Sequence, residues 1–161
     1  MSYPLAELPA RVGTELFRSD WIPLRLEDEQ AFAGATFLRE DFLGRPPSNG
    51  DPYGENLLSG FLLLSLLVAV HKRYLDVDAD TAYALNYGLE KVRFLHPVLA
   101  GQKVRVRAEL LDVKERDPGR YRVLTRNVME VEGSDTPAMV ADWLTLFVDS
   151  DSADSEEAAD E

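Results

Sequence analysis

Two aspartates stand in the segment that precedes the most apolar stretch of the chain, and they are the first candidates for chemistry. Asp41 and Asp51 lie in residues 37–54, a segment with three prolines and three glycines. A carboxyl group whose pKa is raised by burial can act as a general base on water, and Glu40 is a third acid of this kind. The competing interpretation is that these acids are solvated in a loop, and it is favoured for this composition.

Several side chains around this segment can hydrogen-bond a substrate or a water molecule. They are Tyr53, Asn56, Ser59 and Asn86. Asn56 and Ser59 have a structural alternative, because both residue types cap the free N–H groups at a helix start. That capping interpretation is at least as well supported as a binding role.

Histidine is scarce, which limits acid–base chemistry. His71 precedes Lys72 and Arg73 and is predicted to complement the dipole at a helix end or to cap that end. His96 precedes Pro97 and is predicted to be a turn residue. The chain has no cysteine, and it has no cluster with metal-ligand spacing and no glycine-rich phosphate loop. We therefore expect no metal and no cofactor.

The element that must position these residues is the stretch from Glu55 to Tyr74. Its core, Leu57 to Val70, contains only apolar residues, two serines and one glycine. The run is too short to span a membrane but suits a helix that is buried on nearly every face.

The rest of the chain supplies cover for that helix. Residues 14–24 are predicted as a strand and residues 27–36 as a short helix with Phe32 and Ala35 facing inward. Four further strands are predicted at 83–95, 102–113, 120–132 and 138–148. Alternation in the second of these places Val104, Val106 and Ala108 on one face. The last strand is apolar on both faces and should lie inside the sheet. A curved antiparallel sheet around one helix satisfies the pattern, which is the α+β hot-dog architecture.

Charge divides the chain into a body and a tail. The formal net charge is −12, and residues 149–161 hold seven acids and no base. We expect one domain over residues 1–148 and a disordered acidic tail over 149–161. A mildly acidic body argues against nucleic acid as a partner. The N-terminal residues lack a signal pattern, so a cytoplasmic location is expected, without a membrane.

Three sequence blocks resemble a known family. They are Ser59-Gly-Phe-Leu-Leu-Leu-Ser-Leu-Leu67, Asn86-Tyr-Gly-Leu-Glu-Lys-Val-Arg-Phe94 and Pro97-Val-Leu-Ala-Gly101. Together they resemble the MaoC-like hydratases, most closely the NodN-like branch. The resemblance covers residues 14–148 and implies a substrate class, acyl thioesters of coenzyme A or acyl carrier protein. It also implies (R)-specific hydration of an enoyl thioester, with an Asp/His pair on one water and the Gly60 N–H as oxyanion donor. Asn86 and Arg93 match the family block and are expected to shape the pocket or the strand.

The chain departs from the family at the residues that do the chemistry. The family pattern places Leu38 where its Asp belongs and Leu43 where its His belongs, and Ser59 replaces a further His. One hypothesis is therefore a non-catalytic subunit that pairs with a catalytic hot-dog subunit. The second is an active hydratase, dehydratase or thioesterase that uses Asp41, Asp51 or Glu40. A purely structural homodimer is the third. In each case an edge of the sheet is expected to pair with a second protomer.

Overall fold

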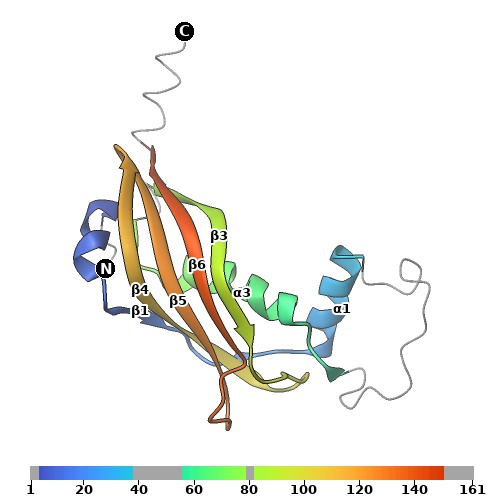
Figure 1. The fold of residues 1–161 in the computed structure, drawn as a ribbon. Coiled ribbons are helices and arrows are strands. Elements are labelled where there is room, and N and C mark those ends of the chain that lie inside the picture. Colours follow the sequence, from blue (N-terminus) through green and yellow to red (C-terminus); the bar gives the residue numbers. More distant parts are fainter. Residues whose placement is uncertain (1–3, 38–55, 79–81, 151–161) are drawn as a thin grey trace.

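The computed structural model describes residues 4–37, 56–78 and 82–150, and all statements on structure concern these ranges (Figure 1). A 3₁₀ helix, η1 (Leu5–Arg11), and two short strands, β1 (Glu15–Arg18) and β2 (Ile22–Pro23), come first. Two α-helices follow, α1 (Leu26–Ala35) and α3 (Gly60–Tyr74). The remaining strands are β3 (Ala82–Phe94), β4 (Lys103–Asp117), β5 (Arg120–Val131) and β6 (Met139–Asp149).

The strands form one antiparallel sheet in the order β1-β4-β5-β6-β3, with β2 also paired to β4. Figure 1 shows this sheet curving past α3, which confirms the predicted hot-dog architecture. The last strand, β6, lies between β5 and β3, as its apolar faces predicted. In the turn between β4 and β5, Gly119 adopts a φ of 73°, which glycine tolerates at little cost. The other edge of the sheet, opposite β1, is β3.

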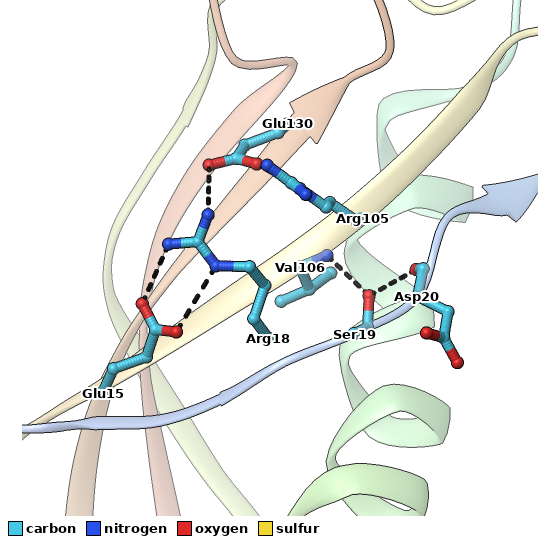
Figure 2. A network of polar contacts seen from close by, with 7 residues as sticks. All are labelled: Glu15, Arg18, Ser19, Asp20, Arg105, Val106 and Glu130. Carbon is cyan, nitrogen blue, oxygen red and sulfur yellow. Dashed lines mark hydrogen bonds and ion pairs between the residues drawn. The ribbon is translucent and has the colours of Figure 1, made fainter.

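The two faces of the sheet differ as the alternation predicted. Val104, Val106 and Ala108 are fully buried on the face toward α3 and pack with Leu63 and Leu67 of the helix. The opposite face carries ion pairs. In Figure 2, Arg18 contacts Glu15 and Glu130, and Arg105 pairs with the same Glu130. These arginines are therefore neutralised by neighbouring carboxylates on the solvent side of the sheet.

The N-terminal strand is divided where one strand over residues 14–24 was expected. Ser19 is the cause, because its Oγ accepts the N–H of Val106 at 2.9 Å and donates to the carbonyl of Asp20 at 2.8 Å (Figure 2). The Val106 N–H of β4 thus bonds to a side-chain oxygen instead of a backbone carbonyl. The regular pairing with β4 is therefore interrupted between β1 and β2.

Helix α3 differs from the prediction in its start and in its burial. It begins at Gly60, because Ser59 caps it, so residues 56–59 stay outside the helix. Its buried residues are Leu62, Leu63, Leu67, Val70 and His71. Phe61 is 69% exposed and Val68 is 37% exposed, so the expected burial on nearly every face is wrong. No helix in the described ranges is both long and apolar enough to cross a membrane.

Candidate functional site

The start of α3 presents backbone N–H groups to its surroundings. Ser59 has extended backbone angles, and its Oγ accepts the N–H of Phe61 at 3.3 Å, which confirms the predicted capping role. The N–H of Ser59 donates to Oε2 of Glu29 at 2.7 Å. The N–H of Gly60 has no acceptor within the described residues. This group therefore remains available to a ligand oxygen, at the positive end of the helix dipole.

Gly60 is also the residue that lets an aromatic ring lie against the helix start. A Cβ atom at this position would stand 3.0 Å from the nearest atom of the Phe94 ring, and three ring atoms would lie within 3.1 Å. The rings of Phe61 and Phe94 lie 6.4 Å apart between centroids. The absence of a side chain at Gly60 thus brings the end of β3 against the first turn of α3.

Glu29 is a residue that the sequence analysis did not select. Its carboxylate reaches out of α1 to the backbone N–H of Ser59, which directly precedes α3. A signal was present in the spacing, because residues three apart share one face of a helix. Phe32 was predicted to face inward and does line a cavity, so Glu29 had to face the same way. Ala35, predicted to face inward with it, is exposed.

An apolar cavity runs along the exposed face of α3. This proximal cavity has a volume of about 460 Å³ and lies between α1, α3, β3 and β6. Its lining residues include Phe32, Phe61, Leu64, Val68 and Trp143. This cavity explains why Phe61 and Val68 of α3 are exposed. The face of the helix that carries them does not pack in the core and forms a wall of the cavity.

A second cavity continues toward the C-terminal end of α3. This distal cavity has a volume of about 320 Å³. It shares Val68, Asn86 and Trp143 with the proximal cavity and adds His71 and Thr145. The two cavities therefore meet at three common residues and form one groove between α3 and the strands β3 and β6.

His71 is held by a buried polar network rather than by the helix terminus. Its Nε2 lies 2.6 Å from Oδ1 of Asn127, which is fully buried. The amide nitrogen of Asn127 donates to Thr125 O, Thr125 Oγ1 and the carbonyl of Ala141. Because these acceptors fix the amide orientation, Oδ1 faces the imidazole and Nε2 must carry the proton.

Burial lowers the pKa of His71 to about 4, although the bond to Asn127 opposes that shift. The ring packs edge-on against Phe17 and Trp143, with centroids 4.9 and 4.8 Å away. The imidazole is therefore neutral at physiological pH. The predicted role of complementing the helix dipole is wrong, because a neutral ring carries no charge to do so.

Of the other residues named in the predictions, four lie within the described ranges, and only Asn86 lines the groove. Asn86 lines both cavities. Asn56 is exposed, and its carbonyl accepts the N–H of Ala100 at 2.8 Å. Arg93 is exposed, and its Nη1 donates to the neighbouring carbonyl of Val92. His96 lies in a bend, as predicted.

The predicted catalytic acids lie outside the described ranges. The residues concerned, and others named with them in the predictions, are Leu38, Glu40, Asp41, Leu43, Asp51 and Tyr53. No group of His, Asp and Glu side chains within the described ranges has an arrangement that would hold a metal ion.

Two known proteins, among others, are similar to this chain over most of its length. Nodulation protein N of Rhizobium leguminosarum bv. viciae is 34% identical over 146 residues, which are 89% of this chain and 90% of that protein. The 3-hydroxyacyl-thioester dehydratase Z of Mycobacterium tuberculosis is 33% identical over 145 residues, 89% of this chain and 95% of the enzyme. No protein-family model matches the sequence.

Solved structures show the same fold at lower identity. A MaoC-like dehydratase from Rhodospirillum rubrum superposes with a TM-score of 0.65 at 15% identity, over 86% of this chain and 92% of the other. An (R)-hydratase from A. caviae superposes with a TM-score of 0.61 at 20% identity, over 83% and 94% of the two chains.

Proposed function

This chain belongs to the MaoC-like hot-dog family of acyl-thioester hydratases and dehydratases that includes nodulation protein N and 3-hydroxyacyl-thioester dehydratase Z, and from this we propose that it binds acyl thioesters of coenzyme A or acyl carrier protein. The observation that carries the proposal is the available N–H of Gly60, the residue next to Phe61, which lines the apolar proximal cavity. The N–H takes the thioester carbonyl oxygen, and the acyl chain lies along α3. Apolar lining suits such a chain, and a helix start favours an oxygen that gains negative charge.

We propose further that the protein is the non-catalytic subunit of a heteromeric hydratase. Hydration of an enoyl thioester requires one group to remove a proton from water and another to deliver a proton to the α-carbon. The family pattern places apolar Leu38 and Leu43 at those two positions. A leucine cannot transfer a proton, but it can contact an acyl chain. The groove would then shape the substrate site of a pair whose acid–base chemistry comes from the partner.

The surface for that partner is the edge formed by β3. Among the described strands, none pairs with the outer side of β3. Exposed large apolar residues follow one another along it: Tyr83, Leu85, Tyr87 and Leu89. An open strand edge that also exposes apolar side chains is a site for strand pairing. A second hot-dog subunit would extend the sheet at this edge and cover the side of β3 that borders the groove. That subunit could be a second copy of this chain or a catalytic relative.

A second candidate function is an active, divergent hydratase, dehydratase or thioesterase. Asp41 and Asp51 stay the predicted bases for that reaction. Glu29 adds to this alternative, because its carboxylate already lies within a hydrogen bond of the residue that precedes Gly60. A water held between such a carboxylate and the substrate would be the nucleophile.

The experiment combines binding and turnover on one purified protein. Saturated acyl-CoA ligands are titrated by calorimetry, and hydration of trans-2-enoyl-CoA of matched lengths is followed by absorbance. Binding without turnover, followed by turnover on addition of a catalytic hot-dog partner, supports the non-catalytic subunit. Absence of binding at every chain length contradicts the acyl-thioester proposal.

Three variants separate the second candidate from the first. Asp41→Asn, Asp51→Asn and Glu29→Gln each remove one charge and keep the size of the side chain. If the unmodified protein turns over alone and one variant abolishes turnover, the protein is an enzyme with a relocated base. Equal turnover in all three variants would reject these carboxylates as the base.

A further inference from the structure

The groove along α3 stays mainly apolar but gains polar side chains as it approaches the end of the helix. Its proximal part is lined by Phe61, Leu64 and Val68, whereas the distal part reaches His71 and Thr145. The four helix residues among them are spaced three, four and three residues apart and so lie on one face of α3: Phe61, Leu64, Val68 and His71. A chain that enters at Gly60 and follows this face must arrive at His71.

Two residues at the distal end are largely buried, yet each has a polar side-chain atom without a hydrogen-bond partner among the described residues. His71 is 8% exposed and bonds only through Nε2, which leaves Nδ1 without a partner. Thr145 is 5% exposed, and its hydroxyl also has none. No fully buried side-chain nitrogen or oxygen in the described ranges lacks a partner. Both atoms must therefore keep contact with open space, and the distal cavity is the space that both residues line.

The protonation state of His71 decides what this end of the groove can recognise. Nε2 donates its proton to Asn127, and burial lowers the pKa of the ring to about 4. Nδ1 is then a hydrogen-bond acceptor whose direction is fixed by the core network. The hydroxyl of Thr145 can accept or donate beside it.

We propose that His71 and Thr145 form a polar subsite that takes a hydroxyl group at the far end of the acyl chain. This inference rests on the proposed acyl-thioester function and assigns a substrate class to it, ω-hydroxylated or similarly polar-ended acyl groups. His71 lies eleven residues after Gly60, which is roughly 16 Å along the helix axis. An extended chain advances about 1.2 Å per bond, so roughly a dozen carbons reach from the thioester to the subsite.

The test compares pairs of ligands that differ only in the terminal hydroxyl. Dodecanoyl-CoA and 12-hydroxydodecanoyl-CoA are titrated by calorimetry, with octanoyl-CoA and 8-hydroxyoctanoyl-CoA as a pair too short to reach. We expect the hydroxyl to tighten binding roughly fivefold to tenfold in the long pair, as the two added hydrogen bonds, to Nδ1 of His71 and to Thr145, would together. No tightening is expected in the short pair.

Variants locate the effect at the distal end. Thr145→Val keeps the side-chain shape and is expected to reduce the hydroxyl preference to about twofold, because one hydrogen bond is lost. His71→Phe keeps an aromatic ring and should remove the preference. Ser65→Ala deletes a hydroxyl from the proximal cavity and should change both ligands of a pair equally. If His71→Phe does not fold, Thr145→Val alone decides the result.

Three outcomes are distinguishable. A hydroxyl preference that Thr145→Val diminishes supports the subsite. Equal affinity for the two long ligands, or a preference that Thr145→Val leaves intact, overturns the subsite and leaves acyl-thioester binding in place. Absence of binding by all four ligands overturns the proposed function and the subsite together.

Discussion

The two ends of α3 are built in opposite ways. At its start, the available group is a backbone N–H of Gly60, and the neighbouring Ser59 N–H is held by a carboxylate from another helix. At its end, a side chain is fixed inside the core by Asn127, with no charged residue in the network. One end stays open through backbone geometry, and the other is set by a buried polar network. The difference indicates that the start offers a backbone donor to a ligand, while the end offers side-chain atoms whose orientation is fixed by the core.

The largest effect should come from the network at the helix end. Asn127→Ala leaves the Nε2–H of His71 buried without an acceptor and opens a void at a fully buried position. We expect a loss of about 3 to 4 kcal/mol in the free energy of unfolding, from the unpaired donor and the void together. Chemical denaturation measures it.

Ser59→Ala is the matched variant at the other end. It removes only the cap to Phe61 and should cost about 1 kcal/mol. If Ser59→Ala were as destabilising as Asn127→Ala, the two ends would not differ in the way described.

Acid should weaken the same end selectively. The folded-state pKa of His71 is about 4, below the ordinary value of 6.5, so the unfolded chain takes up a proton first as the pH falls. The neutral ring therefore supports the fold fully above pH 6.5, and that support is lost as the pH falls toward 4. The loss amounts to about 3 kcal/mol for a shift of this size.

Denaturation between pH 7 and pH 4 measures this loss, with His71→Phe as the reference that has no imidazole to protonate. The native protein should lose stability more steeply than the variant. Parallel curves for the two proteins would show that His71 does not titrate with a lowered pKa.

The sequence predicted those structural features that depend on residues close together in the chain. The alternation over Val104, Val106 and Ala108 predicted the buried face of β4, and Ser59 predicted the helix cap. Long-range pairs were missed, because Asn127 lies 56 residues from His71 and Glu29 lies 30 residues from Ser59. The apolar composition of α3 also concealed the groove, since a wall for an acyl chain and a wall of the core need the same residue types. The predicted bases Asp41 and Asp51 stay predictions.

A smaller effect on stability, but a clear one on binding, is expected at the helix start. Gly60→Ala places a methyl group 3.0 Å from the Phe94 ring. Phe94 is 47% exposed and can move, so the cost should be about 1 kcal/mol of stability. The displaced ring and the added methyl both crowd the Gly60 N–H, and we expect acyl-CoA affinity to fall roughly tenfold, equivalent to about 1.4 kcal/mol.

Gly34→Ala is the control for this substitution. Gly34 lies in α1, and a Cβ atom there would meet no atom within 4 Å. Alanine should stabilise that helix by up to about 1 kcal/mol and leave acyl-CoA affinity unchanged. Equal affinities for the Gly60→Ala and Gly34→Ala proteins would remove Gly60 from the binding site.

The smallest expected effect on stability distinguishes two interactions of the acids in α1, with the helix dipole and with the N–H of Ser59. Glu29 and Glu27 both lie in its first turn, where a negative charge is favourable. Only Glu29 also accepts the N–H of Ser59, at 2.7 Å. Glu29→Gln keeps an acceptor but removes its charge, so the link to α3 weakens, and we expect a loss of about 1 kcal/mol. Glu27→Gln gives up the dipole interaction alone and should cost about 0.5 kcal/mol. Thermal unfolding of the two variants measures the difference, and equal losses would mean that the contact between α1 and α3 contributes nothing beyond the dipole.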